Sequence, residues 1–98
     1  MDGIFDATMS SLERGIDRTT KTHEVIAQNI ANANTPGYVA KKFDQVLERA
    51  VERRDTPGVN LEEEMAEQAK NSGRHSAYVK LMSTKLAILR TVISQGRK

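Results

Sequence analysis

Residues 26–38, which read IAQNIANANTPGY, carry the signals for the end of a helix and for a turn after it. Pro36 disfavours the helical region for the residue before it, Thr35. Glycine directly after proline suits the two central positions of a type II turn, where Gly37 supplies the positive φ. The pattern predicts an α-helix that ends near Asn32 and a tight turn that follows it.

A heptad stripe precedes this turn and predicts a first helix from about Ile4 to Asn32. The spacings within the stripe alternate between four and three residues, which is typical of a helix that packs lengthwise on another helix. No proline interrupts the segment, and Gly15 weakens it only slightly. At ~1.5 Å per residue the helix would be roughly 43 Å long. The stripe consists of Phe5, Met9, Leu12, Ile16, Thr19, His23, Ile26 and Ile30.

Signals for both ends of a helix delimit the last third of the chain. Asn60 followed by Glu63 forms a capping box, in which the Asn side chain accepts a hydrogen bond from the first turn and Glu63 reaches back. Residues 62–64 are all Glu, and negative charge is favourable at this end of the helix dipole. Gly96 and the basic residues Arg97 and Lys98 suit the helix end.

The last helix carries a heptad stripe of its own and would be roughly 50 Å long. Two helices of similar length around a short connector predict an all-α fold, an antiparallel coiled-coil-like hairpin. We divide this core domain into the first helix with its turn motif (1–38), a connector (39–59) and the last helix (60–98). The second stripe consists of Leu61, Met65, Gln68, Ser72, His75, Val79, Met82, Leu86, Leu89 and Ile93.

The connector is short and highly charged. We expect it to contain at most two or three helical turns, and the sequence DTPG at residues 55–58 predicts a second turn. The apolar side of this brief helix would be formed by Phe43, Val46, Leu47, Ala50 and Val51.

The last helix has more apolar surface than a two-helix hairpin can cover. Each helix of such a hairpin buries one face, so a second apolar face must meet something else. This surplus predicts oligomerisation. The second face consists of Ala66, Ala69, Gly73, Ala77, Leu81, Ile88 and Val92.

The composition excludes several classes of protein. The 98 residues have no Cys, a net charge of +2 and only four aromatic residues. Disulfides and thiolate zinc sites are therefore absent, and the charge is too balanced to indicate nucleic-acid binding. No apolar run reaches the ~20 residues that span a bilayer. The N-terminus lacks the features of a secretory signal, so we expect any export to proceed without a cleaved signal peptide.

The side chains that could support catalysis or metal binding are few. His23 and His75 both fall on the heptad stripes, but a metal would need a third or fourth ligand. Polar residues on such a stripe more commonly set the register of the helices. The serines have no base arranged beside them, and there is no glycine-rich phosphate loop. We expect no catalytic residue, metal, cofactor or small-molecule substrate.

A helix end does not by itself explain the amides of the turn motif. Gln28, Asn29 and Asn32 lie within a helix, where Asn is disfavoured. Asn side chains both donate and accept hydrogen bonds, so they can bind a neighbouring backbone. The small residues Ala27 and Ala31 beside them would allow another element to approach closely.

Residues 26–38 closely resemble the N-terminal signature shared by flagellar rod and hook proteins. Residues 61–72 and 86–90 resemble a proximal rod subunit of that family more than its relatives. Together these stretches lie in the two terminal thirds of the chain. The resemblance implies a structural subunit of the bacterial flagellar basal-body rod, exported through the flagellar type III apparatus. It would polymerise helically in the periplasm, with its terminal helices around the export channel.

The same resemblance implies the partners and the assembly surface. The partners would be further copies of the chain, other rod subunits, the adapter that joins the rod to the membrane ring, and the export gate. The connector is shorter than is usual in this subunit, so any β-rich projection would be reduced or absent. The predicted assembly residues are Leu12, Ile16, Ile26, Asn29, Ile30, Asn32, Asn34, Pro36, Gly37, Tyr38, Met65, Ala69, Val79, Met82, Leu86, Leu89 and Ile93.

Two other classes of protein remain as alternatives. A cytoplasmic helical adaptor or export chaperone would also have heptads and exposed apolar faces. A small metal-binding or nucleic-acid-binding protein would use His23, His75 and the short basic clusters. Zinc titration and salt-dependent DNA binding test the latter, and we expect both to be negative.

Overall fold

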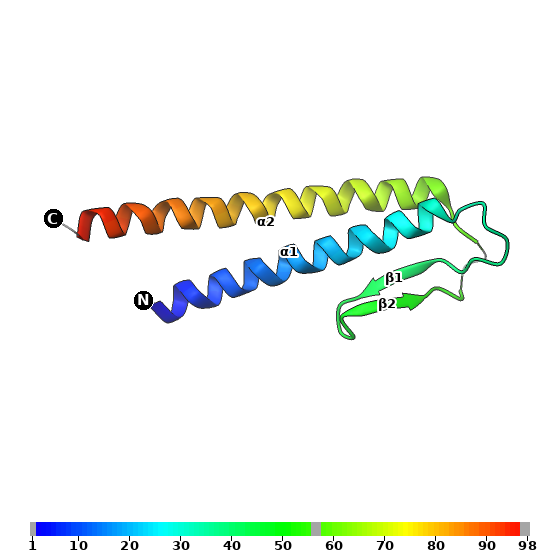
Figure 1. Ribbon diagram of the computed structural model, residues 1–98, viewed down its shortest axis with the longest axis horizontal. Coiled ribbons are helices and arrows are strands. Elements are labelled where there is room, and N and C mark those ends of the chain that lie inside the picture. Colours follow the sequence, from blue (N-terminus) through cyan, green and yellow to red (C-terminus); the bar gives the residue numbers. More distant parts are fainter. Residues whose placement is uncertain (1, 56–57, 97–98) are drawn as a thin grey trace.

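The computed structural model of the chain describes residues 2–55 and 58–96. Its elements are, in order, α1 (Asp2–Ala31), β1 (Lys41–Asp44), β2 (Arg49–Glu52) and α2 (Leu61–Gly96) (Figure 1). The two helices run antiparallel, and both ends of the chain lie at what we call the open end. The connector lies at the opposite, closed end. The predicted hairpin of two long terminal helices is confirmed.

The turn after α1 has the predicted geometry. Tyr38 N–H donates to the Thr35 carbonyl at 3.2 Å, which places Pro36 and Gly37 at the two central positions. Gly37 has a φ of 78°, the left-handed value that the third position of a type II turn requires.

The first turn of α2 has half of the predicted capping box. Glu63 N–H donates to Asn60 Oδ1 at 3.1 Å, so Asn60 is the N-cap. The Glu63 carboxylate binds Arg53 at 3.4 Å instead of reaching back. Arg97 and Lys98, which were predicted to end this helix, lie outside the described residues. So do Thr56 and Pro57 of the second predicted turn.

The prediction of a brief helix in the connector is wrong. Residues 41–52 form an antiparallel hairpin in which Lys41 pairs with Glu52 and Asp44 with Arg49. Asp44 Oδ1 accepts hydrogen bonds from the backbone N–H groups of Val46 and Leu47 at 2.8 and 2.9 Å. Such an Asx turn gives Asp44 a reason to reverse the chain rather than continue a helix. From the family resemblance we expected any β-rich projection to be reduced or absent, and the structure has two strands of four residues each at this place.

The strand pair adds a third layer at one end of the molecule. β1 contacts α1, and the pair lies on the side of α1 that faces away from α2 (Figure 1). Arg18 of α1 binds Glu48, which lies in the turn between β1 and β2, at 3.1 Å. The pair therefore covers α1 only toward the closed end, and no third layer covers the open end.

The helices contact each other along a heptad seam, but one half of the predicted α1 stripe is displaced. Leu12, Thr19 and Ile26 are buried, as predicted. The predicted seam residue His23 is exposed. At the predicted seam position Ile30 the side chain is half-buried, and its neighbour Asn29 is fully buried instead. The seam of α1 is therefore rotated toward its polar residues.

The seam of α2 is displaced in the same direction. Glu64 and Asn71 are buried in place of Met65 and Ser72, which are exposed. The predicted seam positions Val79, Leu86 and Ile93 are also exposed, at 42%, 40% and 47%. Most of the apolar residues that periodicity assigned to the interior thus lie on the flank of the helix, whereas Met82 and Leu89 are half-buried.

The core of the molecule is small and half polar. The buried apolar residues are Leu12, Val25, Ile26 and Ala40. The buried polar residues are equally numerous, namely Thr19, Asn29, Glu64 and Asn71. Polar groups in such positions are tolerated only when they are hydrogen-bonded, so their partners decide how the hairpin is held.

Candidate functional site

Asn29 is the centre of a hydrogen-bond cluster at the closed end. Its side chain is fully buried, at 0% exposure. Nδ2 donates to the Lys41 carbonyl at 2.7 Å and to Glu64 Oε2 at 3.1 Å. Oδ1 accepts from Lys41 N–H at 2.9 Å and from the Tyr38 hydroxyl at 3.1 Å. All four hydrogen-bonding positions of the amide are therefore used, and one side chain joins α1, β1 and α2.

The two bonds between Asn29 and Lys41 imitate the pairing of neighbouring strands. The side-chain amide offers one donor and one acceptor to the backbone of Lys41, as a peptide group would. The start of β1 is thereby fixed against the last turns of α1. This explains why the motif requires an amide at position 29, which the helix alone does not.

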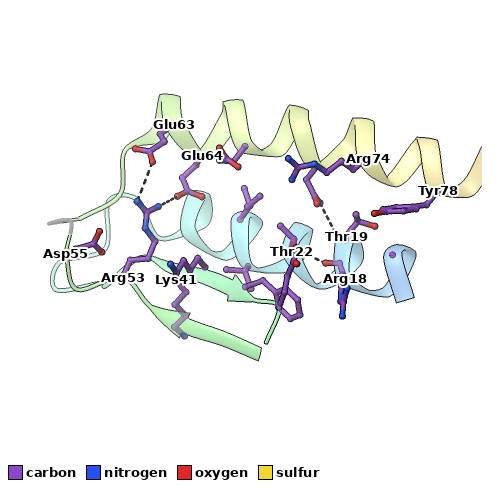
Figure 2. A pocket seen from close by; sticks show the side chains of 18 residues that line it. Arg18, Thr19, Thr22, Lys41, Arg53, Asp55, Glu63, Glu64, Arg74 and Tyr78 are labelled. Carbon is purple, nitrogen blue, oxygen red and sulfur yellow. Dashed lines mark hydrogen bonds and ion pairs between the residues drawn. The ribbon is translucent and has the colours of Figure 1, made fainter. Parts of the chain in front are cut away.

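Arg53 balances the charge of Glu64, which is only 4% exposed. Its guanidinium lies 3.5 Å from Glu64 Oε1 and 3.4 Å from Glu63 Oε1 (Figure 2). Arg53 N–H also donates to the buried Ala40 carbonyl at 2.7 Å, which fixes the backbone that carries the guanidinium. The buried carboxylate is therefore paired and hydrogen-bonded, as such a charge must be.

Tyr38 completes the cluster from the turn. Burial raises the pKa of its phenol, and the nearby negative charge of Glu64 raises it further. The phenol therefore stays protonated and can donate to Asn29 throughout the physiological pH range.

Asn32 serves the end of α1 itself. Its Nδ2 donates to the Gln28 carbonyl at 2.9 Å, and its Oδ1 accepts from the Thr35 hydroxyl at 3.2 Å. Thr35 N–H also donates to the Asn32 carbonyl at 3.0 Å. The two amides of the motif thus have different roles, since Asn29 binds distant elements and Asn32 fixes the turn.

A second set of polar contacts crosses the middle of the seam. Asn71 Nδ2 donates to the Thr19 carbonyl at 2.7 Å. A hydrogen bond of 2.8 Å joins Thr19 Oγ1 and His75 Nδ1. Because the hydroxyl donates to the Ile16 carbonyl at 2.9 Å, the proton of this bond belongs to Nδ1 of the imidazole. His75 therefore joins α2 to α1 across the seam, and His23 does not take part in this contact.

Gly15 allows the helices to approach closely beside Tyr78. A Cβ atom built on Gly15 would lie 2.7 Å from Tyr78 Cε1, which is too close for a side chain. The ring of Tyr78 therefore lies directly on the backbone of α1. The glycine that weakens α1 as an isolated helix is needed for its packing.

Two grooves flank the seam. One, of about 470 Å³, lies between the helices and the strand pair and is lined by charged residues that include Arg18, Arg53 and Arg74 (Figure 2). The other, of about 450 Å³, is lined by polar residues that include both His23 and His75. Within residues 2–55 and 58–96, no three acidic or His side chains are grouped as a metal would require. In the same part of the chain, neither helix is apolar enough to cross a membrane.

The predicted assembly residues fall into three groups by exposure. Leu12, Ile26 and Asn29 are buried inside the chain. Half-buried are Ile16, Ile30, Asn32, Tyr38, Met82 and Leu89. Exposed are Asn34, Pro36, Gly37, Met65, Ala69, Val79, Leu86 and Ile93.

Sequence reasoning missed four residues of the closed end and the seam, namely Arg53, Glu64, Asn71 and Tyr78. The acidic run 62–64 is explained by helix capping, so nothing in the sequence distinguishes the buried Glu64 from its exposed neighbours. Asn71 offered a usable signal, because an amide inside a good helix needs a reason, as Asn29 does.

Two comparisons with known proteins match this sequence. The model of a family described as "Flagella basal body rod protein" matches residues 13–38, which include the second half of α1 and the turn. The chain is also 29% identical to the flagellar basal body rod protein FlgB of Bacillus subtilis (strain 168). That alignment of 127 residues includes 96% of this chain and 98% of the relative, so the relative carries residues that have no counterpart here.

These two matches support a flagellar basal-body rod protein as the class of this chain. Of the proteins of that class, the chain resembles FlgB.

Proposed function

We propose that this chain is a structural subunit of the flagellar rod that polymerises helically through α1 and α2 to build the proximal part of the drive shaft and its export channel. Its partners would be further copies of the chain, other rod subunits, the adapter to the membrane ring, and the export gate. Its place would be the periplasmic part of the basal body, reached without a cleaved signal peptide.

The observation that best supports this proposal is that the chain alone exposes more surface than a compact protein of its size. Its accessible surface is 7296 Å², against the ~5,600 Å² that scaling predicts for a compact protein of 10.9 kDa. Its radius of gyration is 18.2 Å, against roughly 13 Å for a compact chain of this length. Eight large apolar residues of α2 are exposed, and they are Leu61, Met65, Val79, Leu81, Leu86, Ile88, Val92 and Ile93.

An extended hairpin with apolar flanks suits repeated contacts between copies. Heterologous contacts that repeat without closing produce a helical assembly. The exposed predicted residues Met65, Val79, Leu86 and Ile93 are available for such contacts. Leu12, Ile26 and Asn29 would contribute by holding the hairpin in the form that assembles.

The test is whether the chain is built into basal bodies. We expect the tagged protein to copurify with detergent-extracted basal bodies, and the variant Ile30→Asp to be absent from them because a charge replaces a half-buried apolar residue of α1. Lys42→Ala, which removes an exposed side chain, is the matched control and should be incorporated normally. Incorporation of Ile30→Asp at the normal level would contradict the role given to α1.

The same experiment distinguishes a rod subunit from the alternative, a cytoplasmic adaptor or export chaperone. Such a protein would remain in the soluble fraction of the cell and would be absent from purified basal bodies.

A further inference from the structure

The acidic residues of the chain are distributed unevenly along its sequence. All 13 acidic residues precede residue 68, whereas residues 68–98 contain seven basic residues and no acidic one. Among the described residues, no ion pair involves a position beyond Lys70. Most of α2 therefore carries positive charge that nothing within the described chain balances.

Part of this charge lies on an apolar flank of α2. Residues 74, 81, 85, 88 and 92 are spaced by seven, four, three and four, so they share one face of the helix. Leu81 and Ile88 are each 52% exposed and Val92 is 49% exposed. The flank continues from the end of the charged groove, where Arg74 lies beside Tyr78 (Figure 2). We call this surface the α2 flank; it consists of Arg74, Leu81, Lys85, Ile88 and Val92.

The strand pair leaves the α2 flank uncovered. Its tip is held at the level of Arg18, which binds Glu48 at 3.1 Å. The pair lies at the closed end, whereas most of the flank lies beyond it toward the open end (Figure 1). Apolar surface of this extent, bordered by unpaired cations, fits a partner that presents negative charge on a helix.

The chain itself presents such a helix. Asp6, Glu13, Asp17 and Glu24 are all exposed, and their spacing of seven, four and seven places them in one stripe on α1. We call them the acidic stripe. Neither α2 nor the strand pair covers it, because α1 contacts α2 through the face that carries Thr19. Among the described residues, Glu13 and Glu24 take part in no ion pair.

The two surfaces match in spacing. Glu13 and Glu24 are 11 residues apart, as are Arg74 and Lys85, and each interval is about 16.5 Å along a helix. Two charge pairs can therefore form at the same time. From this match we infer that the α2 flank binds the acidic stripe of α1 in a second copy of the chain.

This inference rests on the proposed function and names the surfaces that would join two copies. The contact is heterologous, so each copy keeps one free stripe and one free flank and can bind a further copy. If all copies point the same way along the assembly, α1 of one copy runs antiparallel to α2 of the next. Glu13 then pairs with Lys85, and Glu24 pairs with Arg74.

Charge reversal of the purified full chain tests the contact. One variant carries Glu13→Lys with Glu24→Lys, a second carries Arg74→Glu with Lys85→Glu, and a third carries all four changes. Sedimentation velocity over a range of concentrations measures self-association. We expect each double variant to associate at least about tenfold more weakly than the wild type, because two attractions become repulsions. The fourfold variant should return to within about threefold of the wild type.

A matched control uses Lys80→Glu with Arg90→Glu. These exposed residues of α2 undergo the same change of charge but lie at least about 120° around the helix from Arg74 and Lys85, the charged residues of the flank. This variant should associate as the wild type does. Circular dichroism must show equal helix content in all variants, and high salt should weaken the wild-type association.

Several outcomes would overturn the inference. They are a monomeric wild type at every concentration, a fourfold variant that does not recover, and a control as defective as the flank variant. Binding of the flank to phosphatidylglycerol vesicles without self-association would assign it to a membrane instead. Each of these results leaves the proposed function standing if the wild type is found in basal bodies, whereas its absence there overturns the proposed function itself.

Discussion

Replacement of Asn29 by leucine removes the contact that joins three elements of the hairpin. Leucine has the same branching as asparagine but is larger, so the packing around this fully buried site tightens, and the four hydrogen bonds are lost. Lys41 N–H and C=O lose their partner, and Glu64 keeps only the contact with Arg53. Each buried polar group left without a partner costs about 1–3 kcal/mol. Since the leucine side chain gains apolar burial, we expect a net loss of about 3–5 kcal/mol.

This loss is large beside the stability of a domain of 98 residues, which is about 5–15 kcal/mol. It falls on the closed end, so the amide of Lys41 reports it most directly. A loss of about 3 kcal/mol corresponds to roughly 100-fold faster exchange of that amide with deuterium, because each 1.4 kcal/mol is a factor of ten. Hydrogen exchange followed by NMR measures this.

The matched control for Asn29→Leu is Gln28→Leu. It also replaces an amide with leucine on α1, but at an exposed position, where a change within about 0.5 kcal/mol is expected. Unchanged exchange of the Lys41 amide in Asn29→Leu would refute the role given to this cluster. Equal acceleration in both variants would show that the amide reports general weakening of α1 rather than loss of the cluster.

Three further predictions concern packing, pH and cooperativity. Gly15→Ala should destabilise the hairpin by about 1–3 kcal/mol because its Cβ meets the Tyr78 ring, whereas Gly73→Ala, with open space around it, should stabilise α2 by up to about 1 kcal/mol. Hydrogen exchange of the helix amides, which reports local opening, compares the two variants. Because the pKa of Tyr38 is raised in the folded chain, its phenol contributes to the free energy of unfolding in full below pH 10, the usual pKa of a phenol. This contribution is lost progressively as the pH rises further. The pH at which the protein unfolds in alkali should therefore differ between Tyr38→Phe and the wild type. An equal pH of unfolding in the two proteins would contradict this. The isolated monomer should unfold weakly and without cooperativity when heated in a circular dichroism cell; a sharp transition in a proven monomer would contradict the dependence on neighbours.

The hairpin of two helices could be predicted because its signals are local. Heptad spacing defined both helices, Pro36 and Gly37 defined the turn, and Asn60 defined the start of α2. The turn and the cap depend on the backbone preferences of a few adjacent residues, and the heptad spacing is a repeat within one continuous segment. None of them requires knowledge of what lies across the molecule.

The rotation of the seam could not be predicted in the same way. Apolar residues lie on both flanks of α2, so periodicity alone favoured Met65 and Val79 as interior residues. The observed choice is decided by polar contacts between distant positions, such as Asn29 with Glu64 and Asn71 with the Thr19 backbone. Burial of these groups is favourable only in pairs, and a pairing across 35 or 52 residues leaves no local pattern.

The strand pair was missed for a related reason. The apolar residues of the connector are spaced so that a short helix or a strand pair could use them, and short runs of this kind are ambiguous. The strands are selected by the Asx turn of Asp44 and by the side chain of Asn29, which occupies the place of a neighbouring strand at Lys41. Only the first of these could have been read from the connector itself.

The central claim, that this chain is a rod subunit built from two terminal helices, is tested most directly by an image reconstruction of basal bodies purified from cells that produce it. We expect density for α1 and α2 in the inner layer of the rod, with the strand pair of residues 41–52 outside them and α2 in contact with a neighbouring subunit. A rod in which this chain is absent, or in which its two terminal segments are not paired helices, would show that the chain is not such a subunit.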